Sequence, residues 1–225
     1  MKKILFVALA TLFVIPAIAR DGEPIAASSN GKVTFDMATH IGYGYNITKS
    51  SDFTPAWGGN FFFNILKVGL YPVEDLSLEL GLDFDLKYFS SKTYMFTLDG
   101  DRKVHAGLFP ETDQTLKKTR GGLDVFSLNA PLHLKYNIGH IRLGIGAEAT
   151  YNFAGDTFYR YRHDNVRSRV TETKAAINRF TYGFFATLGV NDGCFFFKYY
   201  PKSSPLLPDG SVDLSFMTVG VAFGF

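Results

Sequence analysis

The segment from Leu76 to Tyr88 alternates strictly between apolar and polar residues. Every even position is apolar, and every odd position is serine, glycine, lysine or an acidic residue. Because successive side chains of a pleated strand point to opposite faces, the segment predicts one strand with an apolar and a charged face. It is about twice as long as the usual strand of roughly 5–6 residues. This length suits a bilayer, although a soluble barrel with its apolar face inward would show the same local pattern.

The first nineteen residues have the pattern of a secretory signal peptide. Lys2 and Lys3 precede an apolar stretch, and Ala17-Ile18-Ala19 matches a small-residue cleavage site. The stretch is shorter than the roughly 20 residues that a membrane-spanning helix needs. We therefore expect residues 1–19 to be removed on export.

Charge and cysteine content exclude some classes of function. Without Lys2 and Lys3, 23 − 2 = 21 basic residues balance 21 acidic ones. The mature chain is then formally neutral, so we expect no nucleic-acid partner. The single cysteine, Cys194, cannot form an internal disulfide and is interpreted as a buried structural thiol.

Seven further segments carry the alternating pattern, with irregularity in residues 58–71 that predicts a β-bulge. They are residues 33–45, 58–71, 128–136, 141–153, 180–190, 194–200 and 217–225. The connections after even-numbered strands are short and those after odd-numbered strands are long, which is typical of outer-membrane barrels. The sequence therefore predicts an all-β fold: an eight-stranded antiparallel up-and-down transmembrane β-barrel with long extracellular loops and short periplasmic turns. We expect this barrel to comprise residues 32–225 in the bacterial outer membrane, and residues 20–31 to form a periplasmic segment before it.

The positions opposite the apolar face predict a polar lumen. They combine glycines with charged residues, which cannot form the dry core of a soluble barrel. An eight-stranded barrel has an interior just wide enough for side chains to fill it. We therefore expect a lumen network of Glu79, Asp83, Asp85, His133, Lys135, Arg142, Glu148 and Arg179.

Within this network, pairing across the turns places Glu79 near His133. We expect Glu79, with Asp83 and Asp85, to neutralise Lys135 and Arg142, because unpaired charges in a confined interior cost several kcal/mol. The rings of Phe185, Phe196 and Phe216 are expected to close the remaining space. The alternatives are that these groups are simply solvated, or that the barrel is a narrow pore.

One hairpin and the C-terminus carry a family resemblance. Residues 127–139, followed by the glycine-rich strand 141–153, resemble the central hairpin of the outer-membrane protein β-barrel domain family, including its PorT-like and porin-family members. The ending on Phe225 is similar to the terminal-strand assembly signal, which implies the barrel assembly machinery as a partner. The resemblance implies fold and location but little about activity. Its PorT-like members imply an alternative role in a secretion or envelope-assembly complex.

The long connection over residues 155–177 is rich in basic residues. Arginine suits phosphate recognition, so we expect contacts with outer-membrane lipid and lipopolysaccharide, or with a protein partner, through Arg160, Arg162, Arg167, Arg169 and Lys174. The alternative is an ordinary solvated charge run. Alternation in residues 94–98, 157–162 and 166–171 predicts hairpins above the membrane, whose free edges could bind a partner.

The competing class is an outer-membrane hydrolase or acyltransferase with a catalytic rim. His40, His105 and His163 lie near Asp36, Asp156 and Asp164 in the sequence. No spacing matches a nucleophile elbow, a metal-ligand cluster or a phosphate loop. We therefore predict no catalytic residue, no cofactor and no metal, and a structural or surface-interaction protein. An enzyme would need a histidine and a carboxylate in hydrogen-bond reach at an open rim pocket.

Overall fold

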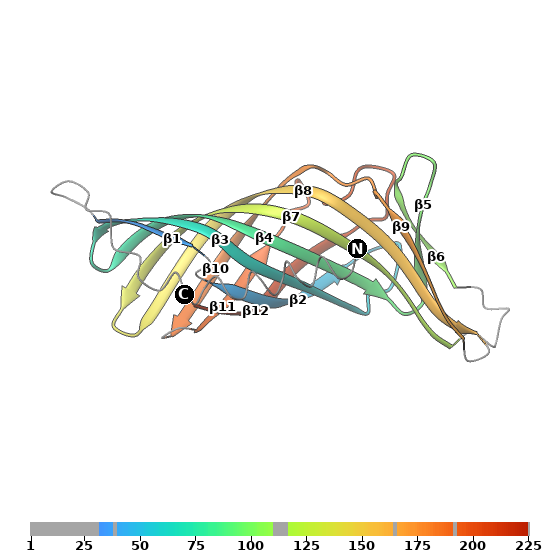
Figure 1. The fold of residues 1–225 in the computed structure, drawn as a ribbon, viewed down its shortest axis with the longest axis horizontal. Helices are drawn as coiled ribbons and strands as arrows, with labels where there is room; N and C mark the ends of the chain where they lie inside the picture. Colours follow the sequence, from blue (N-terminus) through green and yellow to red (C-terminus); the bar gives the residue numbers. More distant parts are fainter. Residues whose placement is uncertain (1–31, 38–39, 110–116, 164–165, 191–192, 225) are drawn as a thin grey trace.

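Eight long strands close into an antiparallel β-barrel (Figure 1). The computed structural model describes residues 32–37, 40–109, 117–163, 166–190 and 193–224. Around the barrel the order is β2-β12-β11-β10-β8-β7-β4-β3, and β3 pairs with β2 to complete the ring. These strands are β2 (Ile41–Lys49), β3 (Trp57–Val73), β4 (Leu76–Ser91), β7 (Lys117–Ile138), β8 (Ile141–His163), β10 (Phe180–Val190), β11 (Gly193–Tyr199) and β12 (Ser215–Phe223). The predicted eight-stranded antiparallel up-and-down barrel is confirmed.

The segment predicted as the first strand, residues 33–45, forms two separate strands that both pair with β3. β1 (Lys32–Met37) pairs with β3 from Tyr71 to Leu66, and β2 continues the pairing at Phe63. Val33, Phe35 and Met37 therefore lie on the same face as the exposed side chains of β2, as the alternation requires. The described residues leave a gap at 38–39 between the two strands.

The predicted bulge in residues 58–71 is confirmed. The register of β3 against β4 shifts between Asn64 and Leu66, which leaves one extra residue on β3. Because one extra residue reverses the facing of everything beyond it, Asn64 and Lys67 can both point inward although they are three positions apart. Asn64 contacts Asp83 and Lys67 contacts Glu79, both inside the barrel.

The barrel wall is apolar outside and polar inside. Each of the eight strands exposes large apolar side chains on its outer face, with exposed fractions reaching 64% for Ile145 and 80% for Phe180. Inside, charged and amide side chains such as Asp85, Lys87 and Asn129 are buried. This arrangement is the reverse of a soluble barrel, in which the apolar face would be buried. In the described part of the chain, no helix is long and apolar enough to cross a membrane.

Three more strands extend the end of the barrel that carries the long connections. β5 (Tyr94–Leu98) and β6 (Val104–Leu108) form a separate hairpin, and β9 (Val166–Thr173) pairs with the upper half of β8. Figure 1 shows all three at one end of the long axis, far from the short turns. The hairpins predicted from the alternation are confirmed. We call this end the loop end and the opposite end the turn end.

Candidate functional site

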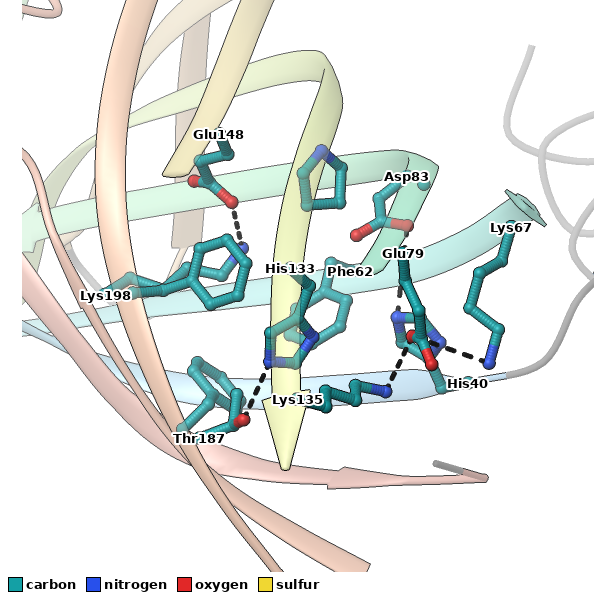
Figure 2. Close-up of a pocket in the computed structure, with 14 residues that line it drawn as sticks. His40, Phe62, Lys67, Glu79, Asp83, His133, Lys135, Glu148, Thr187 and Lys198 are labelled. Carbon is teal, nitrogen blue, oxygen red and sulfur yellow. Dashed lines mark hydrogen bonds and ion pairs between the residues drawn. The ribbon is translucent and has the colours of Figure 1, made fainter. Parts of the chain in front are cut away.

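Charged groups are paired in the turn-end half of the lumen (Figure 2). One Glu79 carboxylate oxygen lies 2.8 Å from Lys135 Nζ and 3.8 Å from Lys67 Nζ. The strand register places Glu79 opposite His133 on β7, as predicted, and Ser77 opposite Lys135. The pairing of Glu79 with Lys135 therefore agrees with the sequence prediction, and Lys67 is a second cation that the irregular pattern of β3 concealed.

Two histidines complete this half of the lumen. His40 Nε2 lies 4.0 Å from Asp83 Oδ1, and Asn64 donates to the same carboxylate oxygen at 2.8 Å. His133 Nε2 forms a hydrogen bond with Thr187 Oγ1 at 2.9 Å. A cavity of about 40 Å³, large enough to hold water, lies between these groups.

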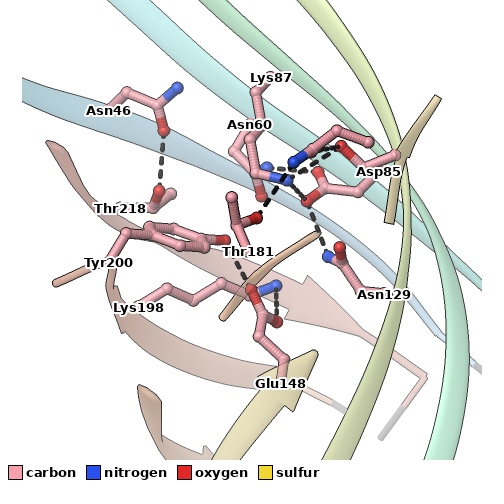
Figure 3. Close-up of polar contacts among 12 residues, drawn as sticks. Asn46, Asn60, Asp85, Lys87, Asn129, Glu148, Thr181, Lys198, Tyr200 and Thr218 are labelled. Atoms are coloured by element: carbon pink, nitrogen blue, oxygen red, sulfur yellow. Dashed lines mark hydrogen bonds and ion pairs between the residues drawn. The ribbon is translucent and has the colours of Figure 1, made fainter. Parts of the chain in front are cut away.

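A second set of pairs occupies the middle of the lumen (Figure 3). Glu148 on β8 accepts hydrogen bonds from Lys198 Nζ at 2.8 Å and from Tyr200 Oη at 2.6 Å. Lys87 Nζ lies 2.6 Å from Asp85 Oδ2, and Asn129 and Asn60 also donate to the Asp85 carboxylate. Paired charges with several hydrogen bonds are the form in which ions are tolerated in a confined interior.

Aromatic rings pack on glycines across the lumen. A Cβ atom on Gly44 would lie 2.9 Å from the ring of Phe196, so a larger residue there would displace that ring. Phe196 packs edge-on against Phe62 at a centroid distance of 5.2 Å. Phe185 packs in the same way against His133 at 4.9 Å. The lumen glycines therefore make room for rings that block the interior.

The loop end is closed by an apolar cap. The cap consists of Phe53, Phe89, Phe96, Val104, Leu123, Val125, Ala175, Tyr200, Leu206, Leu207, Val212, Leu214 and Phe216, all buried. Hydrogen bonds join its segments, for example from Val212 N to Val104 O at 2.8 Å and from Asn178 N to Leu206 O at 2.9 Å. The long connections therefore form a packed layer across the barrel mouth.

The structure corrects two expectations about the lumen network. Arg179 is exposed, and its guanidinium donates to the Phe153 carbonyl outside the lumen. Asp85 pairs with Lys87 on its own strand and not with Lys135 or Arg142, because residues two apart share a face. Arg142 lies opposite Asn137, and the remaining predicted residues, Glu79, Asp83, His133, Lys135 and Glu148, are buried inside the barrel.

Lys198 and Tyr200 were missed by sequence reasoning. Lys198 on β11 and Tyr200 just after it alternate with the exposed Phe197 and Tyr199. The alternation alone therefore indicates that both side chains point into the barrel. Their partner could not be deduced, because Glu148 lies two strands away and β10 intervenes.

The predicted basic residues lie on the outer face of the β8–β9 extension. Arg160 lies opposite Arg169, and Arg162 lies opposite Arg167. Arg160, Arg167, Arg169 and Lys174 are exposed, and the Lys174 backbone N–H donates to Asp156 at 3.3 Å. The sequence predicted the basic residues of this segment but not their direct opposition.

An acidic pair lies just below these arginines. The apolar outer band ends at Phe126 and Ala154, and Asp124 lies opposite Asp156 at the next outward position. Like charges directly opposite each other in a sheet are destabilising, so this pair weakens the pairing of β7 with β8 at that point.

The histidines do not form a catalytic rim in the described residues. His105 Nε2 lies 2.8 Å from Asp99 Oδ2, but both side chains are exposed on the β5–β6 hairpin and neither lines the lumen cavity. The hydrogen bond from His105 lowers the pKa of Asp99. His40 lies inside the lumen, and the side chain of His163 is outside the described residues, as is Phe225. Over the described ranges, no three His, Cys, Asp or Glu side chains lie close enough to hold a metal ion.

Comparisons give structural neighbours but no family. No family model and no curated protein matches the chain. The attachment invasion locus protein Ail of Yersinia pestis is similar at 13% identity and a TM-score of 0.33, over 87% of this chain and 99% of that one. Neisserial surface protein A is similar at 10% identity and a TM-score of 0.36, over 89% of this chain and 100% of that one. A major outer membrane protein from Thermus thermophilus is similar at 13% identity and a TM-score of 0.39, over 88% of this chain and 86% of that one. Function must therefore be inferred from the residues of this barrel.

Proposed function

We propose that this protein is an integral barrel of the bacterial outer membrane that does not conduct solutes and that acts through the surface of its loop end. The observation that carries the proposal is the inverted wall. Exposing a large apolar side chain to water costs about 1.5–3 kcal/mol relative to burying it, and every strand of the barrel exposes several. A bilayer removes that cost, and a closed barrel satisfies the backbone hydrogen bonds inside it.

The filled lumen supports a role other than transport. The ion pairs of Glu79 and Glu148, the ring of Phe196 and the apolar cap occupy the path between the two ends. A wide pore needs a continuous aqueous channel, which eight-stranded barrels are too narrow to hold. The folded loop end, with its exposed arginines on β8 and β9, is then the part that can contact other molecules.

Electrophoresis and conductance together test this proposal. The protein is extracted from the membrane fraction in mild detergent, and its mobility is compared with and without boiling. We expect a compact band that shifts only on boiling, and no large steady conductance in planar bilayers. A soluble protein without a mobility shift would refute the membrane location, and a large steady conductance would refute the closed lumen.

A further inference from the structure

Five arginines form two rows across the outer face of the loop end. Arg120 on β7, Arg160 on β8 and Arg169 on β9 lie directly opposite one another, and Arg162 and Arg167 form the next row. Like charges placed directly opposite in a sheet are destabilising. Among the described residues, no carboxylate lies within ion-pair distance of Arg160, Arg167 or Arg169. In the described part of the chain, no salt bridge therefore offsets the repulsion among these three arginines.

An aromatic ladder of Trp57, Tyr88 and Phe158 supports this surface. The rings of Trp57 and Tyr88 are 5.1 Å apart, and Tyr88 stacks on Phe158 at 6.0 Å with an interplanar angle of 15°. The Arg120 guanidinium lies over Trp57 and Tyr88 at 5.5 and 5.4 Å, and the Arg169 guanidinium lies over Phe158 at 4.5 Å. Stacking holds these two cations against the barrel wall, so less side-chain entropy is lost when they bind an anion.

The strand beneath the ladder leaves room for its rings. Gly122 lies opposite Phe158, and a Cβ atom there would come within 2.5 Å of the Phe158 ring, so glycine lets the ring lie flat on β7. Arg120 donates to Ser90 Oγ at 3.1 Å, and this hydrogen bond helps to hold its guanidinium over the ladder.

The height of the arginine rows indicates the kind of partner. Below them the outer face is apolar, with Leu86, Phe126 and Phe153 facing outward. Tyr88 and Asp124 follow, and the first arginine row lies above these two. In the proposed orientation, the guanidiniums are level with the headgroups of the outer leaflet and face sideways into it. An anion carried by a lipid reaches this height with its acyl chains against the apolar band.

We propose that the two arginine rows and the aromatic ladder bind the phosphate groups of a phosphorylated glycolipid in the outer leaflet. The inference rests on the proposed membrane location. Arginine presents planar forks of N–H donors that match phosphate oxygens, and charge-assisted hydrogen bonds to phosphate are among the strong ones. The bound phosphates offset the repulsion between the opposed arginines.

Native mass spectrometry of the full-length protein in mild detergent tests the inference. The probe is bis-phosphorylated lipid A, compared with the same lipid after enzymatic dephosphorylation. We expect the wild-type protein to retain the phosphorylated lipid and R160Q/R169Q to retain at least tenfold less. The matched control is R102Q/K202Q, which removes two positive charges from exposed positions elsewhere on the loop end and should retain the lipid as the wild type does.

The outcomes separate this inference from the proposed function. The phosphate site would be overturned if the wild type and R160Q/R169Q retained the phosphorylated lipid equally. It would also be overturned if the wild type retained the dephosphorylated lipid as well as the phosphorylated one. In both cases a band that shifts on boiling would still support the barrel. Displacement of lipid A by an equal concentration of dextran sulfate would overturn the lipid assignment in favour of a soluble polyanion. Loss of the boiling-dependent mobility shift in the wild type would instead refute the membrane barrel itself.

Discussion

Removing the Glu148 carboxylate should destabilise the barrel by about 3–5 kcal/mol. Glu148 accepts hydrogen bonds from Lys198 and Tyr200, and Lys198 is only 5% exposed. In Glu148→Gln the Lys198 ammonium stays inside the lumen without its main counterion. Breaking a buried pair in this way typically costs 3–5 kcal/mol, whereas an exposed pair is worth about 0–1 kcal/mol. The lower limit of about 3 kcal/mol corresponds to more than a hundredfold change in the folding equilibrium.

Urea titration of the protein in phospholipid vesicles measures this change. The single tryptophan, Trp57, begins β3 and reports on the folded barrel by its fluorescence. Glu74→Gln, in an exposed turn, is the matched control and should leave the unfolding free energy within about 0.5 kcal/mol of the wild type. The double variant Glu148→Gln/Lys198→Met should recover much of the loss, because it also removes the stranded cation.

Two results would refute the reasoning. If Glu148→Gln unfolds at the same urea concentration as the wild type, the Lys198 ammonium is solvated and the pair does not fill the lumen. If the double variant is as unstable as Glu148→Gln, the loss comes from packing and not from an unpaired charge.

Three further changes test other parts of the structure. Gly121→Val should push the β5–β6 hairpin away from β7, because a Cβ atom at Gly121 would lie 2.8 Å from Met95 Cα. We expect faster protease cleavage within residues 94–108, with the mobility shift on boiling retained. Asp124→Asn should raise the unfolding free energy at neutral pH by about 0.2–1 kcal/mol, because it removes the repulsion between Asp124 and the directly opposite Asp156; an unchanged unfolding free energy would contradict it. Phe216→Ala should lower the unfolding free energy by about 3–5 kcal/mol, because the Phe216 ring stacks on Tyr200 at 4.5 Å inside the cap. A loss below about 1 kcal/mol would indicate that the cap is loosely packed.

Much of the barrel could be predicted from local pattern. Alternation along Leu76–Tyr88 defined a two-faced strand, and matching neighbouring strands from their turn ends placed Glu79 opposite His133, although the long connection through β5 and β6 separates β4 from β7. Both predictions depend on the period of the strand, which determines the face on which each residue lies. The misfit of Asn64 and Lys67 even indicated the bulge of β3.

The distribution of apolar and charged residues along each strand determined by itself that the chain forms an inverted, eight-stranded barrel. Only the tertiary structure decided which lumen charges meet across several strands and which arginines oppose each other. Glu148 reaches Lys198 across β10, and Arg120, Arg160 and Arg169 align through two successive registers. Register depends on bulges, such as those between Lys117 and Arg120 and between Phe126 and Ser127, and its shifts add up from strand to strand. Contacts across several strands therefore follow from the closed barrel and not from any one segment.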